Sequence, residues 1–366
     1  MAVVTILGTG FTGATQCFFG AVGVTISLNA AGTSFTCIPP AGSGTVSISI
    51  TSAFGSSVVG TGVQGYTYMA PPTTSSLGTT MGPVAGGTSV VITGTNFYNR
   101  QFAPNSNEAF PGVTLPVAFG ITGSTGGVIN STSQVTVSTP AVLAAGEVNV
   151  NLNTPTGTAS TQIYTYIALP ILTSTSPAGA SGPLAGGTRL RIIGSNLSTT
   201  SGVTMGGIQG ATLEVIAATG VTLLSPTSTT AGAKIIQVTT AGGVTSSSTI
   251  TFTYVALPSI DPAGIAPAAG ITAGGTTVTI TGTNLSNPQF VLFGITQGTS
   301  TISNSTGATL IAVSPAYLGT QASLPAIVSI SVRTAGGTGT LANAYTYVGP
   351  MSISSITPNR GPTGGG

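Results

Sequence analysis

One motif, found three times in full, constrains the fold of this chain more than any other feature. It reads GPVAGGTSVVITGTNF at 82–97, GPLAGGTRLRIIGSNL at 182–197 and AGITAGGTTVTITGTNL at 269–285. Each copy is followed by three further segments, always in the same order. The first is an apolar run that ends in an aromatic residue or Met before glycine, the second is a run that ends at Ser-Pro or Thr-Pro, and the third is a hairpin. A fixed order of segments at a regular period indicates tandem domains.

Apolar and hydroxylated residues alternate with a period of two within these segments, and glycine- and proline-rich turns separate them. This alternation is typical of short antiparallel strands with one buried face, and no helical periodicity interrupts it. Each repeat is therefore predicted to be an all-β sandwich of roughly 85–100 residues. We expect these domains at 71–168, 169–256 and 257–349, in a linear array.

Residues 1–70 repeat the same order without the opening strand, so they predict a further sandwich that lacks its first strand. Residues 350–366 match the openings of the other repeats and predict the first strand of another domain. When GPTGGG at 361–366 is placed before AVVTILGTGF at 2–11, the two pieces form one motif, with Met1 left out as a start residue. The candidate subunit-contact residues of this strand are Ser352, Ile353, Ile356, Pro358 and Pro362.

Two accounts fit this match between the ends. In the first, the strand at 350–366 of one copy pairs with the open sheet of residues 1–70 in the next copy, as in strand addition at an exposed edge. Such a head-to-tail contact does not close on itself and produces a filament. In the second account, the chain is a stretch of a longer array of similar domains. The sequence leaves both open.

The complete repeat resembles the IPT/TIG domain. The resemblance rests on G-P-x-x-G-G-T followed by an alternating strand and G-x-(N/G)-(F/L), then V-x-(F/M)-G, a strand ending in Ser/Thr-Pro and a closing Tyr-Thr-Tyr. It covers nearly the whole chain and implies an immunoglobulin-like fold. Plexins, related receptors, some transcription factors and many bacterial and viral surface proteins share this fold, so the resemblance specifies the fold and not the function.

The resemblance also implies a disulfide between Cys17 and Cys37. In the receptor members, a Cys after the V-x-x-G strand pairs with one on the strand before Thr-Pro. Cys37 matches the second position, whereas Cys17 lies two residues before Phe19 and departs from the first. A disulfide would stiffen the domain that lacks its first strand and would indicate an oxidising compartment. The alternative is two separate buried thiols.

The residues needed for catalysis and metal binding are missing. The sequence contains no histidine, and its charged residues make up only 3% of the chain. Its four acids lie far apart in sequence: Glu108, Glu147, Glu214 and Asp261. We therefore expect no enzyme, no metal site and no cofactor. Six basic residues are too few for nucleic-acid binding, and no apolar run approaches the roughly 18–20 residues that span a bilayer.

A loop at 98–116 is inserted only in the second repeat. Its candidate contact residues are Tyr98, Arg100, Phe102, Glu108 and Phe110. Long loops on a rigid scaffold are often functional. Lateral packing between filaments and ligand capture are both compatible with it, as is an insertion without function.

Asn-x-Ser/Thr sequons mark possible glycosylation sites at Asn130, Asn196, Asn284 and Asn304. Two of them, Asn196 and Asn284, occupy the fixed Asn/Gly turn of the repeat. We interpret these two first as turn residues and second as glycan sites.

A surface with few charged side chains costs little side-chain entropy to bury and repels its own copies weakly. The first functional hypothesis is therefore a structural subunit of an extracellular, cell-surface or virion-surface filament, with copies of itself as the partner. The alternative is a glycan- or receptor-binding segment of a large multi-domain adhesin or phage tail-fibre protein.

Overall fold

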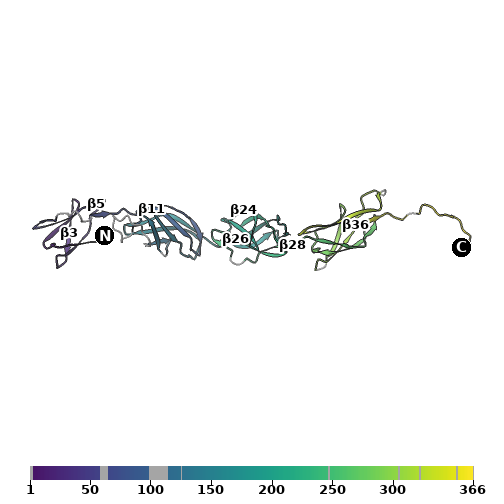
Figure 1. Ribbon diagram of the computed structural model, residues 1–366, viewed down its shortest axis with the longest axis horizontal. Helices are drawn as coiled ribbons and strands as arrows, with labels where there is room; N and C mark the ends of the chain where they lie inside the picture. Colours follow the sequence, from purple (N-terminus) through teal and green to yellow (C-terminus); the bar gives the residue numbers. More distant parts are fainter. Residues whose placement is uncertain are drawn as a thin grey trace. The chain divides into compact units, whose positions relative to one another are not determined.

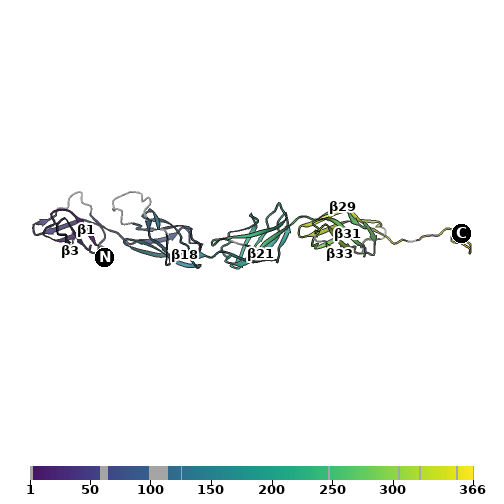
Figure 2. The same cartoon turned by 90° about the horizontal axis from the view of Figure 1, so that it is seen from below.

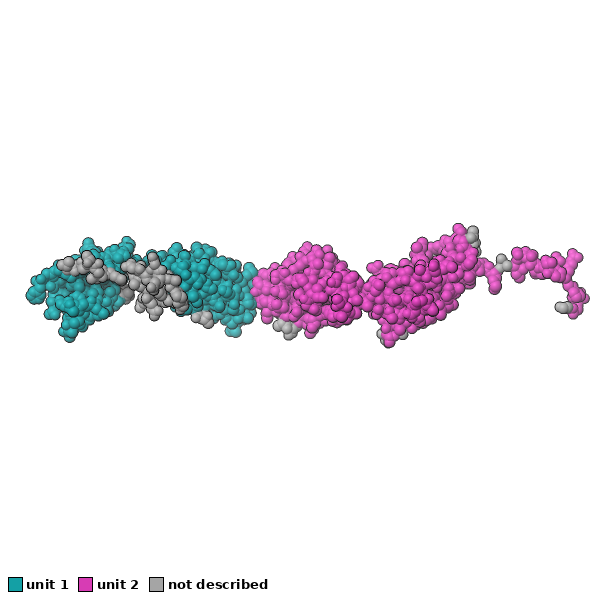
Figure 3. Space-filling view, in the orientation of Figure 1, with its two compact units in different colours: residues 1–167 teal, residues 168–366 magenta. Residues whose placement is uncertain are grey.

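The computed structural model describes residues 3–57, 65–98, 114–124, 126–245, 248–303, 306–320, 323–351 and 353–365 of the chain. β-Strands paired into sheets form the domains in these ranges, and no α-helix occurs in them (Figures 1 and 2). This confirms the predicted all-β class. Accordingly, no helix of the described part is long and apolar enough to cross a membrane. The chain divides into two compact units, Met1–Ile167 and Ala168–Gly366, coloured separately in Figure 3.

The second domain, in the first unit, is a sandwich of two sheets. One sheet has the order β12 (Thr114–Leu115), β15 (Gly127–Ser131), β16 (Gln134–Ser138), β11 (Ser89–Thr95), β9 (Thr73–Leu77). The other has the order β10 (Met81–Pro83), β18 (Gly157–Ile167), β17 (Gly146–Thr154), β13 (Val117–Phe119), β14 (Thr122–Gly123). Buried residues from both sheets form one core, as the alternating pattern predicts.

The third domain, in the second unit, repeats this plan. Its first sheet has the order β19 (Ile171–Ser176), β21 (Arg189–Ser195), β25 (Gly220–Leu224), β24 (Ala211–Ala217). Its second sheet has the order β20 (Ser181–Pro183), β28 (Thr251–Val255), β26 (Gly232–Thr240), β22 (Gly202–Met205), β23 (Ile208–Gln209), and β27 (Gly243–Val244) pairs with β26.

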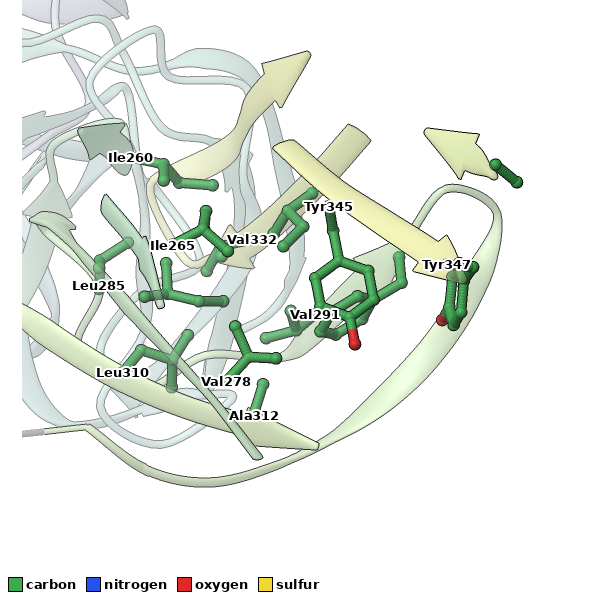
Figure 4. Close-up of a cluster of buried hydrophobic side chains, with 14 residues drawn as sticks. Ile260, Ile265, Val278, Leu285, Val291, Leu310, Ala312, Val332, Tyr345 and Tyr347 are labelled. Atoms are coloured by element: carbon green, nitrogen blue, oxygen red, sulfur yellow. The ribbon is translucent and has the colours of Figure 1, made fainter. Parts of the chain in front are cut away.

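In the fourth domain one long strand, β33 (Thr296–Ser303), pairs in both sheets and joins them. The combined order is β29 (Ser259–Ala266), β31 (Thr277–Thr283), β34 (Thr309–Val313), β33, β32 (Phe290–Phe293), β35 (Ala326–Thr334), β36 (Gly337–Val348), β30 (Ala269–Ile271). Figure 4 shows its core, where Tyr345 and Tyr347 of β36 lie among aliphatic side chains. The Tyr347 hydroxyl donates to the carbonyl oxygen of Pro315 at 2.9 Å, which ties the closing strand to the Ser-Pro turn.

The opening strand of these three domains is divided between the two sheets. Its first half, β9, β19 or β29, runs antiparallel to the strand of the repeated motif, β11, β21 or β31. Its second half, β10, β20 or β30, runs parallel to the closing strand, β18, β28 or β36. We call these two halves the split first strand. It covers one edge of each sheet.

The first domain has the remaining strands of this plan. One sheet has the order β1 (Val4–Leu7), β4 (Ser34–Cys37), β3 (Val22–Leu28), β2 (Ala14–Phe19), β6 (Ile48–Ser52), β7 (Gly55–Ser56), and a second pairs β5 (Gly44–Val46) with β8 (Tyr66–Tyr68). Its fully buried core holds only Cys17, Phe19, Phe35 and Cys37, and the other apolar residues packed there are only partly buried. This domain therefore covers its core less completely than the other three, within the residues the structure describes.

Candidate functional site

Two strand edges of the first domain are open among its described residues. The motif strands of the other domains have a neighbour on each side, whereas β1 pairs only with β4. The closing strand β8 likewise pairs only with β5. Both open edges are those that the split first strand covers in the other domains. Their unpaired N–H and C=O groups can accept an added strand.

A glycine marks the point where the split first strand approaches the motif strand. A Cβ added at Gly94 would overlap the carbonyl oxygen of Thr73, so only glycine permits this approach. The equivalent residues Gly194 and Gly282 meet the carbonyl oxygens of their own first strands in the same way.

In the first domain, Gly8 occupies the position of Gly94. A Cβ at Gly8 would overlap the Phe11 ring, as one at Gly94 would overlap the Phe97 ring. Gly8 is therefore required by packing within its own domain and is also compatible with a closely packed first strand.

The second open edge has a matching feature. In the second domain Gly82 of β10 crosses the closing strand so closely that an added Cβ would overlap the Tyr164 hydroxyl, and Gly270 crosses Tyr345 in the same way. Tyr66 is the equivalent aromatic residue of the first domain. It is only partly buried, whereas Tyr164 and Tyr345 are fully buried beneath their first strands.

A groove of about 470 Å³ lies against the sheet of β3 and β4. It is lined in part by Val24, Ile26 and Cys37, which belong to the core cluster of the domain. The equivalent residues Leu213 and Leu223 line a groove in the third domain, which has its first strand, so this groove is a feature of the repeat and not of the missing strand.

The segment at 350–366 has the features of a split first strand but forms no strand in its described residues. The described residues of this segment are exposed, and Figure 3 shows them as a thin tail of chain. Its apolar side chains are exposed to a degree that is unusual for isoleucine, 83% for Ile353 and 68% for Ile356. Pro358 and Pro362 are exposed as well, and Ser352 lies outside the described residues.

Counting from the closing tyrosine of each preceding domain aligns this segment with the others. Ile353 lies as many residues after Tyr347 as Ile260 lies after Tyr254, so Ile353 is equivalent to Ile260. Ile260 is only 7% exposed in the core of the fourth domain. Ile356 takes the place of Leu77, which packs against the core of the second domain. Both isoleucines therefore stand at inward-facing positions of a first strand.

The turn at the end of this segment already has the geometry of the other domains. The Gly365 N–H donates to the Pro362 carbonyl oxygen at 3.2 Å with a φ of 73° at the glycine. In the second domain the Gly86 N–H donates to the Pro83 carbonyl oxygen at 3.0 Å, also with a φ of 73°. The segment is locally shaped to enter the repeated motif.

The two cysteines are buried free thiols in the core of the first domain. Burial raises the pKa of Cys17 to about 12, and the nearby Cys37 contributes through its charge and a hydrogen bond. Burial also raises the pKa of Cys37, which the hydrogen bond from Cys17 partly opposes. Because burial raises both pKa values, the less reactive thiol form is favoured for both cysteines at neutral pH. The Cys17–Cys37 disulfide stays a prediction.

The remaining candidate residues are not brought together with these edges. In the inserted loop only Tyr98 belongs to the described residues, where it is half-buried; Arg100, Phe102, Glu108 and Phe110 lie outside them, as does the sequon residue Asn304. Asn130 is exposed on β15, and its Nδ2 donates to Thr136 Oγ1 at 2.6 Å. No group of three or more metal-ligating side chains occurs in the described ranges.

Asn196 and Asn284 have left-handed backbone conformations in the turn after the motif strand, with φ of 59° and 57°. Their side-chain amides donate to the carbonyl oxygens of Leu169 and Leu257. Sequence reasoning marked these as turn residues but missed the hydrogen bonds. It also missed Gly8 and Tyr66.

The sequence comparisons agree with this fold. The family model of the IPT/TIG domain matches residues 170–254 and 260–347, which are the third and fourth sandwiches. These two sandwiches are tandem IPT/TIG domains. No curated protein matches it.

Several solved structures are similar to this chain at low identity. They include the plexin A4 extracellular region (14% identity, 87% of this chain and 33% of that chain, TM-score 0.37). A protein solved with a xylogluco-oligosaccharide (18%, 76% and 60%, TM-score 0.32) and the Escherichia coli adhesin FdeC (13%, 76% and 93%, TM-score 0.26) are also similar. The chain spans 33% and 48% of two plexin A4 chains.

Proposed function

We propose that this protein is a structural subunit of an extracellular or virion-surface filament, assembled when residues 350–366 of one copy complete the first domain of the next. We call residues 350–366 the donor segment. The observation that carries the proposal is the fit of the donor segment to the open edges of the first domain. The segment has two exposed isoleucines at positions that face the core in other domains, a glycine before Pro362 and a turn that is already formed. The acceptor supplies an unpaired β1 edge and a partly uncovered core.

The register of the joint follows from the second domain. There, Leu77 pairs with Ile92 and Thr74 with Gly94. Transferred to the joint, the same register places Ile356 opposite Ile6 and Ile353 opposite Gly8. Gly361 then crosses Tyr66 as Gly82 crosses Tyr164.

Apolar burial contributes to this joint. Burying an exposed isoleucine contributes about 1.5–3 kcal/mol, and the donor segment offers two. Backbone hydrogen bonds to β1 and β8 would add to this, while the conformational entropy lost on ordering the segment opposes it. The turn at Pro362 and Gly365 lowers that cost because it is already formed.

The composition supports dense packing of copies. The net charge is +2 over 366 residues, so subunits repel one another weakly. A donor and an acceptor at different places on one chain give a head-to-tail contact, which extends into a filament unless the geometry closes a ring.

The test uses the full chain and two matched variants. Ile353→Asn combined with Ile356→Asn should remove assembly, because two amides would then enter an apolar core. The control Ser354→Asn changes the intervening position, which faces outward in the other domains, and should assemble like the parent. Negative-stain microscopy and sedimentation velocity over a range of concentrations measure the outcome.

Long filaments from the double variant, or from a chain lacking residues 352–366, would exclude strand completion as the joint. A parent chain that stays monomeric at high concentration and binds surface glycans would instead support the second function, a binding segment of a large adhesin or tail-fibre protein.

A further inference from the structure

Three asparagine side chains fasten the start of the split first strand to the turn that follows the motif strand. Asn96 Nδ2 donates to the carbonyl oxygen of Pro71 at 2.9 Å. Asn196 makes the same bond to Leu169 at 2.9 Å, and Asn284 to Leu257 at 3.0 Å. The accepting carbonyls belong to the short linkers that precede the second, third and fourth domains. We call this contact the linker clamp.

The linker clamp needs both a particular backbone and a particular side chain. All three asparagines have φ between 57° and 62°, a left-handed conformation that asparagine adopts more readily than most residues. From that position the amide donates to the linker, at a carbonyl that lies outside the strands. Each clamp therefore fixes where the chain enters the next domain.

The first domain has the same turn without the side chain. Gly10 precedes Phe11 as Asn96 precedes Phe97, and its φ is 76°. The Phe11 N–H donates to the Gly32 carbonyl at 3.1 Å, matching the bond from Phe97 to Thr132 at 3.0 Å. A Cβ at Gly10 would meet nothing within 4 Å, so space for a side chain is present.

We infer that Gly10 leaves the joint between subunits without a linker clamp, so that this joint opens and bends more readily than the linkers inside the chain. This inference rests on the proposed assembly, in which Pro350 of the donor segment takes the place of Pro71. The Pro350 carbonyl would lie beside Gly10, with no amide to bind it. The residue at position 10 thus sets the lifetime of the subunit contact.

Restoring the clamp tests the inference. Gly10→Asn in the full chain should slow the dissociation of filaments about fivefold, the effect of one added neutral hydrogen bond. Gly10→Asp is the matched control, because aspartate tolerates the same φ but its carboxylate cannot donate to a carbonyl. Subunit loss after dilution, followed by light scattering, measures the dissociation rate, and circular dichroism confirms that each variant is folded.

The two hypotheses fail in different ways. If the parent forms filaments that need the donor segment, but Gly10→Asn and Gly10→Asp dissociate at the same rate, the clamp inference is wrong and the assembly stands. If the parent forms no such filaments, the assembly is wrong and the inference goes with it.

An internal clamp gives a measurement that does not depend on assembly or on the folding of the Gly10 variants. Asn196→Asp should speed protease cleavage in the linker around Leu169 relative to the parent chain. An unchanged cleavage rate would show that the asparagine does not hold the linker, and would overturn the inference.

Discussion

At the scale of single residues, burial raises the pKa of the closing tyrosines. The pKa of Tyr166 rises to about 12, mainly by burial and then by the neighbouring Tyr164, and that of Tyr347 rises to about 12 by burial and Tyr345. Burial also raises the pKa of Tyr254. An unfolded tyrosine titrates near 10. The unfolded chain therefore loses these protons first as the pH rises.

This order of proton loss predicts how stability depends on pH. The stabilising effect of the neutral tyrosines is complete below about pH 10 and is lost as the pH rises from about 10 to 12. The chain has no histidine, so no side chain with an ordinary pKa changes charge between about pH 5 and 8. Thermal unfolding should give a constant melting temperature from about pH 5 to 8, a decline above about pH 8.5, where the Cys17 thiol ionises in the unfolded chain, and a steeper fall above 10. A melting temperature that changes near pH 6.5 would contradict this assignment.

At the scale of elements, the glycine beneath the split first strand decides whether that strand can pair. Gly94→Ala should destabilise the second domain by about 1–3 kcal/mol, because the added methyl group forces β9 away from β11. Gly123→Ala is the matched control: this glycine is in strand β14, and a Cβ there meets nothing within 4 Å. Urea unfolding of both variants measures the difference. Equal midpoints would mean that β9 contributes little to the domain.

Much of the element plan could be predicted from the sequence, because strands with one buried face repeat with period two. The motif strands, the Ser/Thr-Pro strands and the closing hairpins fall where the alternation places them. The division of the first strand between two sheets could not be predicted, since Ser-Pro and Gly-Pro mark turns without saying which sheet each half joins. The linker clamp was also beyond prediction, because it joins residues 27 apart in sequence, as in Asn196 and Leu169.

At the scale of the whole molecule, the shortage of charge predicts that assembly depends on apolar burial and backbone pairing instead of ion pairs. The only ion pair in the described residues joins Arg189 and Glu214 at 3.5 Å, and both side chains are largely exposed. Exposed pairs contribute about 0–1 kcal/mol and are screened by salt. The donor segment has one charged residue, Arg360, which is exposed.

Filament yield should therefore stay constant as sodium chloride rises from about 0.05 to 1 M, a range over which the screening length falls from above 10 Å to about 3 Å. Sulfate at similar ionic strength should increase the yield, because it strengthens the burial of apolar side chains such as Ile353 and Ile356. Pelleting followed by protein quantification measures both effects. Loss of filaments in 1 M sodium chloride would show that charge pairing holds the subunits together, and would place the contact outside residues 1–70, which contain no charged side chain.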